Sequence, residues 1–253
     1  MRDRFAASGP ASAPVTGALL AINVAFWLLL EFTGGSQNSE NLYRWGAKFG
    51  PAIYNGDWWR LIVPVFMHIG LLHLAANSVG LLIFGSMVER IFGKVQYLAI
   101  YLITGVAGNV ASYWAGPTLG AGGSGALFGV VGAFAIYLLL NRRLLGRYGR
   151  QAFTSVVFIV LINVVIGMTV TGIDNAAHIG GLVAGAATAL LLAPRERVYV
   201  AMTDPVFGAP RLSLRTIQKP GFRVALAVLL ASLILYLAVR WVSSDYLSRI
   251  DGL

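Results

Sequence analysis

The sequence contains no cysteine and few charged residues. The lack of cysteine excludes disulfide bonds, a thiol nucleophile and thiolate metal sites. Only 11% of the residues are charged, whereas 57% are hydrophobic and the mean hydropathy is +0.74. A soluble domain usually carries about twice that share of charge. The surplus of apolar side chains predicts that much of the surface faces a lipid bilayer.

Acidic residues are scarcer than basic ones, with 10 Asp and Glu against 19 Lys and Arg, a net charge of +9. A positive charge of this size can indicate nucleic-acid binding. Here, however, the basic residues lie in short segments between apolar runs, which is typical of the cytoplasmic side of a membrane protein. We therefore expect no nucleic-acid partner.

Seven apolar segments are candidates for membrane spans, each of which needs about 20 mostly apolar residues. The first covers Val15–Leu30, and the second lies in the second half of the charge-free stretch 61–88. The charge-free stretch between Lys94 and Arg142 is long enough for two helices, joined at the Gly/Pro-rich segment 116–123.

The last three spans follow from two further apolar stretches. Segment 151–194 carries a single charge, Asp174, and folds in half there to give the fifth and sixth spans. Segment 224–239 gives the seventh. With the N-terminus inside, the inner segments hold 14 of the 19 basic residues, so the positive-inside rule supports this orientation.

The sequence therefore predicts an all-α polytopic membrane protein. The first apolar run is too long, and the tail before it too short, for a cleaved signal peptide. The aromatic outer loop is either partly embedded in the headgroup region or an ordinary hairpin above it. The predicted parts are a cytoplasmic tail (1–14), a six-helix core (15–193) with an outer loop (33–60), a flexible, basic cytoplasmic linker (194–221), a seventh helix (222–242) and an outer tail (243–253).

All three histidines, His68, His73 and His178, lie in or at the edge of apolar segments. Ionisable residues are costly there and indicate function. One such histidine is more often a neutral residue hydrogen-bonded between helices, but three favour a site. His73 and Asn77 are four residues apart, so they share one helix face and can direct two hydrogen-bond donors to one point.

Ser124 stands among Gly122, Gly123 and Gly125 at the start of the fourth span. A serine at a helix start is usually a cap. Here the glycines permit close approach of another backbone, and a helix N-terminus offers unpaired N–H groups that suit an oxyanion. The soluble-hydrolase motif G-x-S-x-G does not match, because Ala126 replaces its second glycine.

Two glycine faces predict how Ser124 meets a base. Gly181 and Gly185 share a helix face with His178, which permits close packing against another helix. The fourth span offers a matching face of Gly125, Gly129 and Gly132. Metal-dependent proteolysis needs His-Glu-x-x-His, which is absent, and aspartate-dependent proteolysis needs two carboxylates, which the predicted spans lack. Among these chemistries serine remains.

These motifs, taken together, resemble the rhomboid family of intramembrane serine proteases. The extra helix after the six-helix core is similar to the "6+1" arrangement of some members. The matching segments are Trp59-Arg60, His68-Ile69-Gly70-Leu71-Leu72-His73-Leu74-Ala75-Ala76-Asn77, Glu89-Arg90-Ile91-Phe92-Gly93, Gly122-Gly123-Ser124-Gly125 and Ala177-His178-Ile179-Gly180-Gly181-Leu182-Val183-Ala184-Gly185.

The resemblance implies a role for each residue. Ser124 would be the nucleophile and His178 the general base, without an acidic third member. The backbone N–H of Ser124, His73 and Asn77 would form the oxyanion hole. The supporting positions are His68, Gly122, Gly125, the close-packing Gly181 and Gly185, the structural Arg60 and Glu89, and Phe128, which replaces a common tyrosine beside the histidine.

The function implied is a serine endopeptidase that cleaves single-pass transmembrane proteins through an acyl-enzyme, in a bacterial plasma membrane, with no cofactor or metal. Two other classes stay open at this point. A transporter or channel would show inverted repeats or broken helices in matching halves, and the sequence shows neither. A catalytically silent scaffold that binds membrane segments would share every motif, so only a reactive serine separates it from an enzyme.

Overall fold

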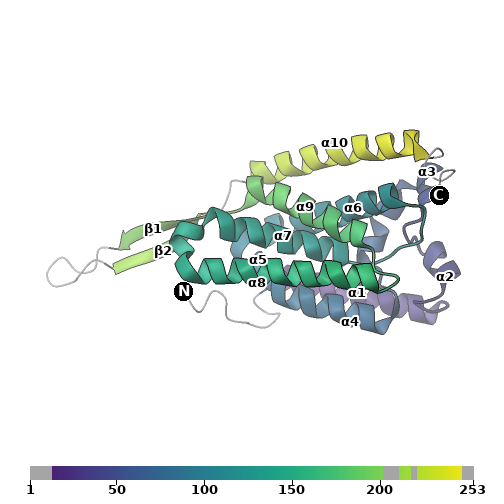
Figure 1. Ribbon diagram of the computed structural model, residues 1–253, viewed down its shortest axis with the longest axis horizontal. Coiled ribbons are helices and arrows are strands. Elements are labelled where there is room, and N and C mark those ends of the chain that lie inside the picture. The colour runs from purple at the N-terminus through teal and green to yellow at the C-terminus, as the bar shows by residue number, and fades with distance from the viewer. Residues whose placement is uncertain (1–12, 202–210, 218–220, 247–253) are drawn as a thin grey trace.

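The computed structural model describes residues 13–201, 211–217 and 221–246 as a helical bundle with one projecting β hairpin (Figure 1). Short helices of the outer loop lie at the end of the bundle opposite the hairpin. The elements in chain order are α1 (Pro14–Phe32), α2 (Ser39–Arg44), α3 (Gly50–Tyr54), the 3-10 helices η3 (Trp58–Leu61) and η4 (Val63–Phe66), α4 (Gly70–Gly80), the π-helical η5 (Leu81–Gly85), α5 (Ser86–Phe92), α6 (Lys94–Ala115), α7 (Ser124–Leu140), α8 (Arg142–Thr169), α9 (Asn175–Leu192), β1 (Arg195–Ala201), β2 (Arg211–Ile217) and α10 (Phe222–Ser244).

Within the described residues, six helices are long and apolar enough to cross a bilayer: α1, the continuous helix Gly70–Phe92, α6, α8, α9 and α10. The remaining predicted span, α7, has 17 residues and is shorter than these. It packs against α6, α8 and α9, and most of its side chains are buried. The chain is thus a multi-pass, all-α membrane protein in which protein largely surrounds α7.

The second span extends beyond the predicted limit at Val88 and ends at Phe92, so it contains Glu89. The expectation that the spans hold no carboxylate is therefore wrong at this position. Glu89 is buried and accepts hydrogen bonds from the N–H groups of Val15 (3.0 Å) and Thr16 (2.8 Å) and from the Thr16 hydroxyl (2.8 Å). These contacts place a carboxylate at the positive N-terminus of α1, which stabilises the anion.

The linker 194–221 was expected to be flexible, but its described residues include a two-stranded antiparallel sheet. β1 pairs with β2 from Arg195 opposite Ile217 to Ala201 opposite Arg211. The start of β1 is fixed to the end of α7, because the N–H of Glu196 donates to the Asn141 side chain (2.9 Å) and the Tyr137 hydroxyl donates to the Glu196 carboxylate (3.0 Å). Side-chain anchors of this kind explain order where composition alone predicted a loose segment.

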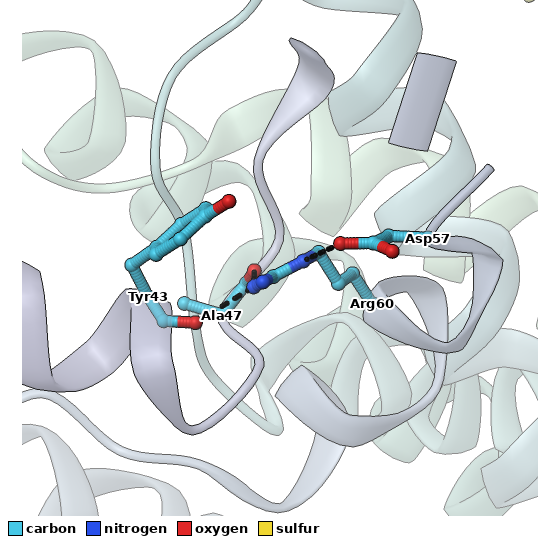
Figure 2. A network of polar contacts seen from close by, with 4 residues as sticks. All are labelled: Tyr43, Ala47, Asp57 and Arg60. Atoms are coloured by element: carbon cyan, nitrogen blue, oxygen red, sulfur yellow. Dashed lines mark hydrogen bonds and ion pairs between the residues drawn. The ribbon is translucent and has the colours of Figure 1, made fainter. Parts of the chain in front are cut away.

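The outer loop 33–60 folds around a buried cation, Arg60 (Figure 2). Its guanidinium donates to the carbonyls of Tyr43 (2.8 Å) and Ala47 (3.2 Å) and to the Asp57 carboxylate (2.9 Å). The same group lies 4.2 Å from the ring centroid of Tyr43. The loop is therefore an ordered unit with its own polar centre, while Trp58 and Trp59 remain partly exposed.

Candidate active site

The hydroxyl of Ser124 faces the imidazole of His178, with Oγ and Nε2 2.9 Å apart. Ser124 is the first residue of α7, but its side chain makes no capping hydrogen bond, and the N-cap residue is Gly123. The capping role that a serine usually has at this position is therefore absent. The hydroxyl is therefore available for the hydrogen bond with His178. The Ser124 N–H has no carbonyl partner inside its own helix.

Glycine allows this contact, because α7 and α9 meet backbone to backbone. A Cβ on Gly181 would overlap the carbonyl oxygen of Gly125, and one on Gly185 would overlap that of Gly129. A third helix, α6, also approaches closely, because a Cβ on Gly108 would lie 2.8 Å from the carbonyl oxygen of Ala177. The predicted glycine faces are thus in contact and define a seam that brings residues 54 positions apart together.

The ring of His178 is held by stacking and not by an acid. Phe128 stacks on it with centroids 4.2 Å apart and planes 5° apart. Nδ1 of His178 is buried and has no hydrogen-bond partner within the described residues. The preceding acid, Asp174, instead caps α9 by accepting the N–H of Ala177 (2.9 Å). The arrangement is therefore a Ser-His pair whose imidazole stacks on an aromatic face.

His73 lies beside the serine. A Cβ on Gly122 would be 3.0 Å from Nε2 of His73 and 3.6 Å from Oγ of Ser124, so both groups border the same glycine. Nδ1 of His73 accepts the N–H of Ile69 (3.4 Å). In the neutral ring this leaves the proton on Nε2, which can therefore donate a hydrogen bond.

The other two predicted polar residues have different positions. The Asn77 amide donates one hydrogen to the carbonyl of His73 (3.0 Å), and none of its described contacts reaches Ser124. His68 is fully buried, and its ring lies edge-on to that of His73 with centroids 5.3 Å apart. His68 thus packs against the ring of His73.

The loop before Ser124 is held by the outer loop through contacts that the sequence did not reveal. Lys48 and Gly120 form an antiparallel bridge, with N–H to carbonyl distances of 2.8 and 2.9 Å. The Gly122 N–H also donates to the carbonyl of Pro64 in η4, just after the outer loop (3.0 Å). We call residues 116–123 the active-site loop.

Lys48 also carries a buried charge close to this loop. Its ammonium donates to the Ser112 carbonyl (3.5 Å), and the Ser112 hydroxyl donates to the Asp174 carboxylate. Burial lowers the pKa of Lys48 from its ordinary value of 10.5, and the nearby carboxylate of Asp174 opposes this shift. The sequence offered only two signals of these contacts: a lysine within the aromatic loop, Lys48, and an aspartate four residues before His178, Asp174.

The described residues contain no cluster of three or more His, Cys, Asp or Glu side chains that can hold a metal ion. A family model for the rhomboid domain matches residues 55–195, which is more than half of the chain. The chain belongs to the rhomboid family. This rhomboid's matched segment includes every residue of the site described above except Lys48 and the outer loop before it.

Named relatives of this rhomboid come from bacteria and plants. Rhomboid protease GluP of Bacillus subtilis is 42% identical over 170 residues, which are 67% of this chain but 33% of GluP. Rhomboid protease AarA of Providencia stuartii is 29% identical over 231 residues, 81% of this chain and 82% of AarA. RHOMBOID-like protein 6, mitochondrial, of Arabidopsis thaliana is 37% identical over 150 residues, 58% of this chain and 48% of that protein. The chain thus spans a third of GluP and most of AarA. The family and its named proteases support an intramembrane serine protease activity for this rhomboid.

Proposed function

We propose that this rhomboid is a serine endopeptidase that cuts transmembrane segments of single-pass membrane proteins with a Ser124–His178 dyad. The observation that carries the proposal is the 2.9 Å contact between Oγ of Ser124 and Nε2 of His178, inside a glycine-lined seam. A nucleophile within hydrogen-bond reach of a base is the requirement for covalent catalysis.

In the first step Nε2 of His178 takes the hydroxyl proton while Oγ of Ser124 attacks the peptide carbonyl carbon. The carbonyl oxygen becomes an oxyanion, stabilised by donors that face it. The Ser124 N–H, His73 Nε2–H and the second N–H of Asn77 are the groups assigned to it. His178 then gives its proton to the leaving amine, the acyl-enzyme forms, and water hydrolyses it with the same base.

The position of the serine supports the proposed substrate class. Ser124 begins α7 at the end of the bundle that carries the outer loop, and exposed apolar side chains cover the surrounding helices. A transmembrane substrate helix has its peptide carbonyls bonded within the helix, so a segment must unwind before Ser124 can attack. We infer entry from the lipid, with the site near the outer face, the N-terminus cytoplasmic and the chain in a bacterial plasma membrane.

A fluorophosphonate probe tests the nucleophile directly. The purified wild-type protein should be labelled and should cut a tagged transmembrane substrate, whereas Ser124→Ala should do neither. Ser155→Ala, which changes an exposed serine on α8, is the matched control and should behave as wild type. Labelling or cleavage that persists in Ser124→Ala would exclude Ser124 as the nucleophile and reopen the scaffold interpretation.

A further inference from the structure

The outer end of α10 contacts the part of the outer loop that holds the active-site loop. α10 packs along α6 and α9, and its C-terminal end lies beside α3 (Figure 1). Two residues past α10, Tyr246 is 3% exposed and belongs to an apolar cluster shared by α3, α6 and α10. Its ring stacks on Tyr54 (centroids 5.3 Å, planes 22° apart) and lies at 5.3 Å from that of Tyr113.

Hydrogen bonding strengthens this junction at one further point. The hydroxyls of Tyr113 in α6 and Ser243 in α10 are 3.0 Å apart. The hydroxyl of Tyr246, in contrast, is buried without a hydrogen-bond partner in the described residues. Tyr246 therefore acts through packing of its ring and hydroxyl, because the hydroxyl makes no hydrogen bond in the described residues.

Gly50 connects Tyr246 to the active-site loop. A Cβ on Gly50 would overlap the hydroxyl of Tyr246 and lie 3.0 Å from the Cα of Pro117. Tyr246 and Pro117 of the active-site loop therefore both border the position that a Gly50 side chain would fill, so the three are packed together. Two residues earlier, the Lys48–Gly120 bridge fixes the same loop by two hydrogen bonds, four residues before Ser124.

We propose that Tyr246 is a positioning residue for the nucleophile, and that the seventh helix is therefore a working part of the catalytic core. Tyr246 holds segment 48–50 against the active-site loop, and that loop sets the place of Ser124 relative to His178. The inference rests on the proposed dyad. Because misplacement by about 1 Å can cost a hundredfold in rate, loss of this support should slow attack without weakening substrate binding.

The experiment compares the fluorophosphonate labelling rate, and kcat and KM for a transmembrane substrate, in purified full-length variants. Tyr246→Ala should reduce the labelling rate and kcat about ten- to hundredfold, with KM close to wild type. Tyr246→Phe should lie between wild type and Tyr246→Ala, because the ring remains but the hydroxyl that packs beside Gly50 is removed. Val239→Ala is the matched control, since it trims another buried member of the same cluster, whereas the side chain nearest Gly50 is that of Tyr246.

Val239→Ala should lower the thermal midpoint but leave the labelling rate unchanged. A wild-type rate in Tyr246→Ala, or an equal slowing in Val239→Ala, would overturn the inference. If Tyr246→Ala does not fold, Gly50→Ala decides: the added methyl pushes against Tyr246, and a wild-type rate there also overturns it. Ser124→Ala is measured in parallel. Labelling of Ser124→Ala would mean that the proposed dyad is wrong, whereas an unlabelled Ser124→Ala with an unaffected Tyr246→Ala would reject only the role of Tyr246.

Discussion

The residues of the site differ in which of their polar atoms make hydrogen bonds to the rest of the protein. Ser124 does not cap its helix, and His178 keeps Nδ1 without a partner in the described residues. His73 is fixed as an Nε2 donor because its Nδ1 accepts a backbone N–H. These contacts fit the proposed roles of nucleophile, base and oriented donor, with an aromatic ring in the place of the acid that orients the base in a triad.

The two side chains proposed as oxyanion donors, His73 and Asn77, should differ from the proposed dyad in how much activity their removal costs. Loss of one donor typically reduces kcat by about 10²- to 10³-fold. Asn77→Ala and His73→Ala should therefore retain measurable cleavage, whereas His178→Ala should retain almost none. Steady-state cleavage of a tagged transmembrane substrate measures this. Full activity in His73→Ala would remove His73 from the oxyanion hole.

Lys48 should make the stability of the fold depend on pH. Burial lowers its pKa in the folded state, so between that pKa and 10.5 the unfolded chain binds more protons. Stability contributed by this group must then rise as pH rises through that window. The thermal midpoint of wild type minus that of Lys48→Met should therefore increase from neutral pH to about pH 9.5. Lys94→Met, at an exposed lysine, should show no such increase, and a difference that falls with pH would contradict the sign.

Helices and strands show which parts of the fold the sequence could predict. Long apolar runs bounded by charge predicted the spans because hydrophobicity sets their length. The glycine faces on α7 and α9 predicted the seam because only glycine permits backbone contact there. The end of the second span was missed because Glu89 and Arg90 suggested a loop, whereas in the fold Glu89 is compensated by the start of α1.

The β hairpin and the Lys48 contacts were missed for a different reason. The apolar alternation Val198, Val200 and Leu212, Leu214 is the sequence signal of a strand pair, but the basic composition of 194–221 concealed it. Lys48, Ser112 and Asp174 are far apart in the chain, and no spacing rule links them. Their proximity follows from the packing of the outer loop on α6 and α9, which only the three-dimensional structure provides.

The seam between α7 and α9 should tolerate no added methyl group. Gly185→Ala would force a Cβ into the Gly129 carbonyl, and overpacking of this kind typically costs about 1–3 kcal/mol. Separation of the helices should also weaken the Ser124–His178 contact, so the fluorophosphonate labelling rate should fall together with the thermal midpoint. Gly17→Ala is the matched control in α1, where a Cβ meets nothing within 4 Å. It should be neutral or slightly stabilising because alanine favours helix, and equal behaviour of the two variants would refute the role of the seam.

At the scale of the whole molecule, the two ends of the bundle have different chemistry. The outer loop, with its partly exposed tryptophans, lies at the end where α7 begins, and the β hairpin lies at the opposite end (Figure 1). The hairpin and the start of α8 carry Arg142, Arg143, Arg195 and Arg197. An excess of Arg and Lys at one end is the signal that sets membrane orientation, so we predict that this end faces the cytoplasm.

The absence of native cysteine makes this orientation directly measurable. In sealed right-side-out membrane vesicles, a membrane-impermeant maleimide should label Asn55→Cys, at an exposed position after α3, without permeabilisation. Arg143→Cys, exposed in the first turn of α8, should be labelled only after the vesicles are opened. Wild type should stay unlabelled throughout. The reverse pattern would place Ser124 near the cytoplasmic face, and the substrate segment would then have to unwind from the inner side. Equal labelling of both variants before opening would contradict a bundle whose two ends lie on opposite sides of the bilayer.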